Sequence, residues 1–79
     1  MKRRHIGICF KNHAKECVVC GETKIVAVHH YNHDHEDNRP ENLVPLCPTH
    51  HAYMHSRFKK LIEEKVRDYV QYFIDEYML

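Results

Sequence analysis

The chain has 79 residues and a formal net charge of +1, so we expect one small domain whose total charge selects no class of partner. A domain of this size gains little stability from its core alone and usually needs disulfides, a metal or a partner subunit. We see neither a secretory leader nor an apolar run that could span a bilayer, and we expect a cytoplasmic protein without membrane contact. Thiols stay reduced there, so the four cysteines are expected to bind metal.

Basic residues concentrate in the first part of the chain. Residues 1–62 carry ten Lys or Arg against six Asp or Glu, whereas residues 63–79 carry two against five. The basic segment 1–16 and the stretch that follows residue 56 could therefore contact phosphate groups, although a solvated surface is the alternative. The candidates for contact with a DNA backbone are Arg3, Arg4, Lys11, Arg57 and Lys59.

The predicted elements follow one another closely along the chain. A short helix is expected around residues 10–15, and the glycine that ends the stretch 17–21 suits a tight turn with positive φ. The apolar run 25–28 predicts a strand, the polar stretch 31–42 a loop, and residues 43–46 a second strand. Pro48 is typical of the first turn of a helix. These elements predict an α+β fold.

The last part of the chain is predicted to be one long amphipathic helix. Residues 49–79 contain no Gly or Pro, and apolar residues recur at steps of three and four: Leu61, Ile62, Val66, Tyr69, Val70, Phe73, Ile74 and Tyr77. A straight helix of this length would reach roughly 45 Å at about 1.5 Å per residue, which is more than so small a domain can cover. Either the helix bends back, or its C-terminal part, residues 56–79, pairs with a second copy in a homodimer.

Two pairs of residues are spaced for one structural zinc ion. Cys17 and Cys20 form the first pair, and Cys47 and His50 form the second at the predicted start of the helix. Structural zinc takes four Cys or His ligands in a tetrahedron, and the two-residue gap within each pair lets both side chains reach one ion. The alternative is that Cys47 is a small core residue and His50 a surface residue.

A second group of histidines is spaced for another metal ion. His51 and His55 lie one helical turn apart on one face, whereas His50 points about 100° away from His51 around the helix axis. His29, at the end of the first predicted strand, supplies a third ligand. Three protein ligands leave positions open for water or a phosphate oxygen. The candidate ions are Mn²⁺, Ni²⁺, Zn²⁺ and Mg²⁺, and imidazole ligands suit the first three better than Mg²⁺.

His30, next to the third ligand, is the candidate general base. An imidazole loses its proton near pH ~6.5, so at neutral pH it can accept a proton from water. Beside a phosphate held by the metal, this proton transfer would activate the water for attack, while the ion would stabilise the developing charge. Cys9 is expected to be a small buried residue, and the histidines without an assigned role are His5, His13, His33 and His35.

The stretch Val28–His30, the polar loop, Pro40–Cys47, and then His51 and His55 together resemble the signature of the HNH endonucleases. The order His-His, Asn, His-x-x-x-His is similar to the nuclease colicins, and zinc-binding Cys pairs flank the motif in many other members. Over residues 17–55 the resemblance implies a small ββα-metal fold with a zinc knot. It implies His29, His51 and His55 as ligands of the catalytic metal, His30 as the base, and Asn42 as the residue that fixes the loop and the base by hydrogen bonds.

Two positions depart from the family pattern. His50 stands where most zinc-bearing members have cysteine, which a Cys₃His zinc site accommodates. His29 stands where many members have aspartate, and the additional imidazole favours transition metals over Mg²⁺. Asp34 and Asn38 occupy positions that are often polar in related sequences.

The resemblance implies a metal-dependent DNA endonuclease whose helix and metal press against the backbone in the minor groove. Contacts to phosphate carry little sequence information, so we expect low intrinsic sequence specificity. A homodimer would cut both strands, whereas a monomer would nick one. The alternative function is a non-catalytic zinc module that binds nucleic acid or a protein. A third option is a nuclease that acts inside a larger phage or mobile-element assembly, in the host cytoplasm.

Overall fold

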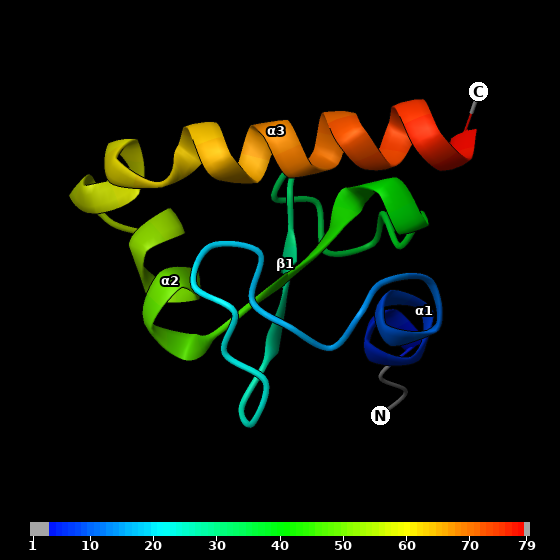
Figure 1. Cartoon of the computed structure of the whole chain (residues 1–79), viewed down its shortest axis with the longest axis horizontal. Helices are drawn as coiled ribbons and strands as arrows, with labels where there is room; N and C mark the ends of the chain where they lie inside the picture. Colours follow the sequence, from blue (N-terminus) through cyan, green and yellow to red (C-terminus); the bar gives the residue numbers. More distant parts are fainter. Residues whose placement is uncertain (1–3, 79) are drawn as a thin grey trace.

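A two-stranded antiparallel sheet with helices around it forms the centre of the molecule (Figure 1). The computed structural model describes residues 4–78. In chain order its elements are α1 (Arg4–Asn12), β1 (Ala27–His30), the 3₁₀ segment η1 (Pro40–Asn42), β2 (Leu43–Leu46), α2 (Pro48–Met54), the 3₁₀ segment η2 (Arg57–Leu61), α3 (Glu63–Phe73) and the π-helical segment η3 (Ile74–Met78). The predicted α+β class is confirmed.

The sheet pairs β1 with β2 so that Val28 lies opposite Pro45 and His29 lies opposite Val44. β2 has the predicted bounds and is buried along its whole length. β1 begins two residues later than predicted, because the predicted first residue, Ile25, is 67% exposed and has no partner on β2. The pairing therefore decides the ends of β1, and it carries both histidines of the strand into the sheet.

The helix predicted around residues 10–15 is present but lies earlier in the chain, as α1 at residues Arg4–Asn12. Cys9 is fully buried on α1, as expected for a small core residue. Burial raises the pKa of the Cys9 thiol to about 12, so this thiol stays protonated.

Most of the described part of residues 49–79 is helical, as predicted, but it is divided into segments because the chain leaves helical geometry after Met54. Ser56 is extended, and its hydroxyl donates to the carbonyl of Tyr53 and accepts from the backbone N–H of Phe58. Such a serine ends one helix and begins the next segment. The longest extent of the molecule is 32 Å, less than the roughly 45 Å that a straight helix would need. α3 therefore runs back across the domain (Figure 1).

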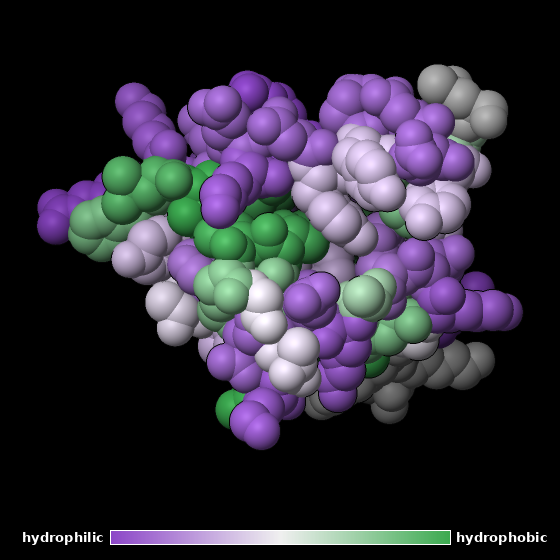
Figure 2. Space-filling model, viewed as in Figure 1, coloured by the Kyte–Doolittle hydropathy of each residue, from purple (hydrophilic) through white to green (hydrophobic). Residues whose placement is uncertain are grey.

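Four residues of the apolar stripe in the last part of the chain face the molecule's own core, whereas Leu61 and Tyr77 of the same stripe are exposed. Ile62, Val66, Val70 and Phe73 are buried, and the first three join one core cluster with residues of β2 and α2. Figure 2 shows apolar side chains reaching the surface beneath the first half of α3 on the face viewed. The helix thus bends back, and a homodimer through α3 stays a prediction. Within residues 4–78 no helix combines the length and the apolar composition that a membrane-spanning segment needs.

Candidate metal centres and the histidine pocket

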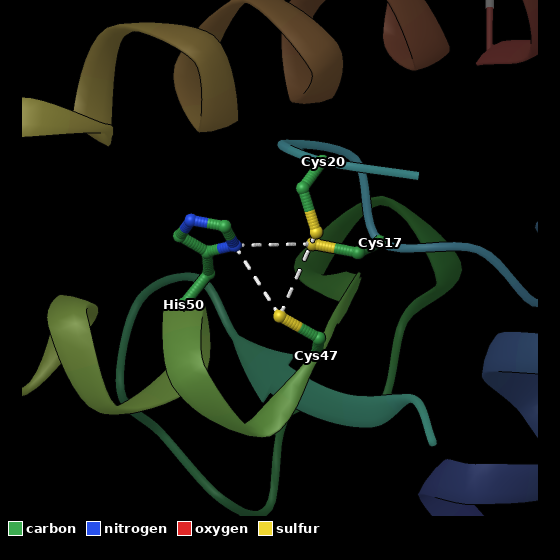
Figure 3. Close-up of side chains that lie close together, drawn as sticks. All are labelled: Cys17, Cys20, Cys47 and His50. Carbon is green, nitrogen blue, oxygen red and sulfur yellow. Dashed lines mark hydrogen bonds between the residues drawn. The ribbon is translucent and has the colours of Figure 1, made fainter. Parts of the chain in front are cut away.

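The four residues predicted to bind zinc lie together (Figure 3). Cys17 and Cys20 come from the turn before β1, Cys47 precedes α2, and His50 lies in its first turn. Their ligand atoms all lie within 4.8 Å of one another. The Sγ atoms of Cys20 and Cys47 are 3.8 Å apart, which matches the roughly 3.8 Å edge of a tetrahedron with Zn–S bonds of about 2.3 Å. The group could hold a metal ion and is compatible with structural zinc.

The imidazole of His50 completes this cluster through Nδ1. That nitrogen lies 3.3 Å from the sulfur of Cys47 and 3.7 Å from the sulfur of Cys17. Cys47 is 6% exposed and also belongs to the core, but His50 points toward the sulfurs rather than away from the protein (Figure 3). The geometry therefore favours the cluster over the alternative of an unrelated core cysteine and surface histidine.

The turn that carries the first cysteine pair is closed by backbone hydrogen bonds. The N–H of Gly21 donates to the carbonyl of Cys17 at 2.9 Å, and Gly21 has φ of +83°, the positive value expected from the sequence. The N–H of Val18 donates to the carbonyl of Pro45 at 3.1 Å and ties the turn to β2. The turn is thereby held beside the start of α2, where the second pair lies.

The surroundings of Cys17 favour its thiolate, the form that binds metal. Burial alone would raise the pKa of this thiol. Hydrogen bonds from backbone N–H groups, the largest from Cys47, and from the His50 side chain outweigh burial and lower the pKa to about 6.

The second predicted group is also brought together. His29 comes from β1, His51 from α2 and His55 from the end of that helix, and their ligand nitrogens lie within 4.8 Å of one another. Nε2 of His51 is 3.3 Å from Nε2 of His55, close to the edge of roughly 3.3–3.4 Å in a tetrahedron with Zn–N bonds of about 2.0–2.1 Å. The three imidazoles could hold a metal ion.

His29 carries the clearest sign of a metal site. It is 1% exposed, and neither Nδ1 nor Nε2 has a hydrogen-bond partner. An unsatisfied buried polar atom is costly, and an ion at this position would satisfy one of the two nitrogens. Burial, and then the nearby imidazoles of His51 and His55, lower the pKa of His29 to about 3. Its ring is therefore neutral, as metal ligation requires.

These three residues share a pocket of about 250 Å³ with Val28 and four further histidines. One is His30, the predicted base, which is 5% exposed. The other three are His5, His33 and His35, which sequence reasoning left without a role. Spacing along the chain gave no sign that these histidines line the pocket. α1, which carries His5, and the loop after β1, which carries His33 and His35, reach the pocket only in the tertiary fold.

The predicted base is oriented by Asn38. Nε2–H of His30 donates to the side-chain oxygen of Asn38 at 2.9 Å. Because Nε2 carries the hydrogen in this pairing, Nδ1 of the neutral ring keeps its lone pair. The sequence singled out Asn38 only as a polar position, and it lies eight positions after His30 in the loop.

Asn42 holds the loop, as expected, but the expectation that it also bonds the base is corrected. Its side-chain oxygen accepts from the N–H of Asn32, and its amide donates to the side chain of Asn32 and the carbonyl of Asp37. The hydrogen bond to His30 comes from Asn38 instead. Asn42 is buried in η1, so it fixes the shape of the loop that presents Asn38.

His13 is buried rather than a surface residue, and it links three elements. Nε2–H donates to the carbonyl of Pro40 at 2.8 Å, and Nδ1 accepts from the hydroxyl of Tyr69 at 2.6 Å. The ring also packs on Phe73, with centroids 4.3 Å apart. His13 thus ties the end of α1 to α3 and to the start of η1. Nothing in the local sequence distinguished it from an exposed histidine.

The predicted DNA-contacting residues do not form one patch. Arg4 and Lys11 are exposed on α1, whereas Arg57 and Lys59 lie on η2. α1 and the segment after α2 lie at opposite sides of the molecule (Figure 1). Arg3 is outside the described residues. Contact of these side chains with DNA stays a prediction.

Comparisons of the chain with protein-family models, with curated proteins and with solved structures give no match. The two clusters and the pocket are therefore the features of the molecule that bear on its function.

Proposed function

We propose that this chain is a metal-dependent endonuclease of the HNH type, which hydrolyses phosphodiester bonds in DNA. The observation that carries the proposal is the convergence of His29, His51 and His55 beside His30 in one pocket. The order of strand, strand and helix over β1, β2 and α2 supports it, because this is the order in the ββα-metal motif that the sequence resembles.

In this proposal the three imidazoles hold one divalent ion. When bound, the ion supplies positive charge to the phosphate and to the leaving oxygen, where negative charge develops. His29 is rigid because it lies in β1, and His51 is set by α2, so the ligand positions need little rearrangement.

His30 acts as the general base of the reaction. Nδ1 has the free lone pair, so it accepts a proton from a water molecule in the pocket as that water attacks the phosphate. Asn38 is a positioning residue, because its oxygen keeps the hydrogen on Nε2. Asn42 supports Asn38 by holding the loop.

The Cys₃His cluster is proposed to bind structural zinc. It joins the turn before β1 to the first turn of α2, and α2 carries two of the three ligands of the catalytic ion. Small domains are commonly stabilised by such a cross-link, and the zinc would fix α2 relative to β1.

DNA is proposed to bind through its backbone with low intrinsic sequence specificity. The described candidates for DNA contact lie on α1 and η2, at opposite sides of the molecule, rather than in one base-reading element. Because the buried residues of α3 pack on the core of the same chain, we expect the isolated chain to nick one strand. Sedimentation at tens of micromolar, together with a gel that separates nicked from linear plasmid, tests this expectation.

The proposal is tested by cleavage of supercoiled plasmid with Mg²⁺, Mn²⁺, Ni²⁺ and Zn²⁺ in turn. We expect the wild type to cut, and His30→Ala to lose about 10²–10⁴-fold in rate, the usual contribution of a general base. His30→Ala should still bind two metal ions per chain. His51→Ala should keep the zinc of the cysteine cluster and lose the second ion.

The alternative, a non-catalytic zinc module, predicts a different pattern. It requires one tightly bound ion per chain and no second, exchangeable ion. If the folded, zinc-loaded wild type cuts DNA with none of the four metals, the nuclease proposal is wrong and the binding module is the better description.

A further inference from the structure

The turn after β1 carries an imidazole that the proposed site does not use. His33 lies three residues beyond His30, and its backbone N–H donates to the carbonyl of His30 at 2.9 Å. Its φ is +66°, and among the described non-glycine residues only His33 has positive φ. Residues other than glycine rarely adopt this backbone conformation, and those that do cluster at functional sites. The turn brings His33 back to the pocket, which its side chain lines.

The ring of His33 lies against two of the three proposed metal ligands. Its centroid is 5.2 Å from that of His29, at an interplanar angle of 86°, and 5.3 Å from that of His55, at 81°. The three ligands themselves have centroids 5.0 to 5.4 Å apart and angles of 71° to 75°. The ring of His33 is therefore as close to two of the ligand rings as these are to one another. Its nitrogens lie outside the set of ligand atoms within 4.8 Å of one another, so its side chain has to turn to reach the ion.

We propose that His33 is a fourth imidazole ligand of the ion held by His29, His51 and His55, and that this ion is Zn²⁺ rather than Mg²⁺. The inference rests on the metal site of the proposed function. Three ligands leave one position of a tetrahedral ion open, and His33 lies at the pocket beside two of them. Four imidazoles suit Zn²⁺, whereas Mg²⁺ takes oxygen ligands in an octahedron.

The fourth ligand differs from the others in its support. His29 is buried in β1 and His51 lies on α2. His55 is exposed but caps the C-terminal end of α2, whereas His33 is exposed and lies on a turn outside any helix or strand. His33 is therefore the ligand that can yield its position to a water or a phosphate oxygen, while the other three keep the ion in place.

A metal titration tests this without reference to DNA cleavage. Protein with one Zn²⁺ per chain in the cysteine cluster is titrated with Co²⁺, a spectroscopic substitute for Zn²⁺. The variant is His33→Gly, because glycine adopts positive φ without strain and the turn is kept. The matched control is His35→Gly, which removes a histidine of the same pocket whose ring contacts His30 but, among the described residues, none of the ligands.

We expect His33→Gly to weaken Co²⁺ binding by about 10–100-fold and His35→Gly to change it by less than about threefold. Proton NMR of the Co²⁺ protein supplies a second readout, since each ligating imidazole gives one shifted N–H signal. The wild type and His35→Gly should share one number of signals, and His33→Gly should have one fewer.

Equal affinity and an equal number of shifted signals in the wild type and His33→Gly would overturn the inference. Tighter Mg²⁺ than Co²⁺ binding would do so as well. The outcome is separate from that of the plasmid assay. If the wild type binds Co²⁺ through His33 but cuts no DNA, the inference holds and the nuclease proposal is wrong. If His33→Gly cuts DNA as well as the wild type and binds Co²⁺ with the same affinity, the nuclease proposal holds and the inference is wrong.

Discussion

Asn38 and His30 are joined by a hydrogen bond of 2.9 Å between the side-chain oxygen of one and Nε2 of the other. This bond links a loop of irregular structure to a strand, and it leaves Nδ1 as the nitrogen that can accept a proton. Asn42 supports the loop from η1, directly before β2, and its side-chain hydrogen bonds go to Asn32 and Asp37 rather than to His30. In the proposed mechanism, the reactivity of His30 therefore depends on a residue eight positions away.

Replacement of Asn38 should slow DNA cleavage without removing metal. Asn38→Ala deletes the acceptor, so the hydrogen is no longer held on Nε2, and we expect a rate loss of about 10- to 100-fold, part of the ~10²–10⁴-fold that a general base contributes. Asn38→Asp keeps an oxygen acceptor and should retain more activity. The measurement is the cleavage rate against pH at saturating metal, with metal per chain determined for each variant. A rate for Asn38→Ala equal to wild type across the pH range would contradict the assigned role.

Loss of one cysteine ligand should unfold the domain. Structural zinc sites contribute apparent binding energies of about 10–16 kcal/mol at neutral pH, comparable with the whole stability of a small domain. We expect Cys47→Ser, or the wild type in excess chelator, to lose zinc and helical circular dichroism together. The control is Cys9→Ala, which removes a buried thiol outside the cluster. It should keep one zinc per chain and lose only roughly 1–2 kcal/mol through the small cavity. A chain that stays folded in chelator would show that zinc is dispensable.

Burial of His13 should make the protein less stable in mild acid. Burial lowers the pKa of His13 below its ordinary value of 6.5. Below pH 6.5 the unfolded chain then binds more protons than the folded one. The contribution of neutral His13 to the free energy of unfolding is therefore complete above pH 6.5 and is lost as the pH falls. Burial raises the pKa of Tyr69 to about 12, so its hydroxyl remains the donor to Nδ1 over this range.

The comparison that isolates His13 is with His13→Gln, which keeps an N–H donor but does not titrate. We expect the free energy of unfolding to fall less steeply between pH 7 and pH 5 in His13→Gln, by up to about 1.4 kcal/mol per pH unit. The zinc ligands are the same in both proteins, so their own acid sensitivity cancels in the difference. Parallel pH profiles would mean that His13 titrates in the folded state as it does in the unfolded chain.

Two phenylalanines should differ in their contribution to stability. Phe73 is 4% exposed and packs on His13, so Phe73→Ala is expected to cost about 3–5 kcal/mol. Phe58 is 44% exposed, so Phe58→Ala should cost less than about 1 kcal/mol. Chemical denaturation at fixed zinc concentration measures both. Similar costs for the two variants would contradict the packing of α3 on the domain, and a dependence of the Phe73→Ala result on protein concentration would point to a dimer.

Much of both metal clusters could be predicted because their ligands are set by local spacing. Cys17 and Cys20 converge through a turn that Gly21 permits, and residues four apart on a helix, such as His51 and His55, must share a face. The pairing of β1 with β2 and the helix α2 are then sufficient to bring the ligands of each cluster together. The bounds of β1 and the place of α1 were predicted wrongly, since pairing and burial, rather than propensity, decide where short elements end.

The sequence by itself determined which side chains could bind metal, how they divide into two sets, and that the fold is α+β. Only the tertiary structure decided that the last helix breaks at Ser56 and returns over the core, because helical periodicity continues through a position where packing demands a bend. It alone also brought Asn38 to His30, His13 to Pro40, and His33 to the ligands. Local patterns depend on neighbours along the chain, whereas these contacts depend on how distant segments pack.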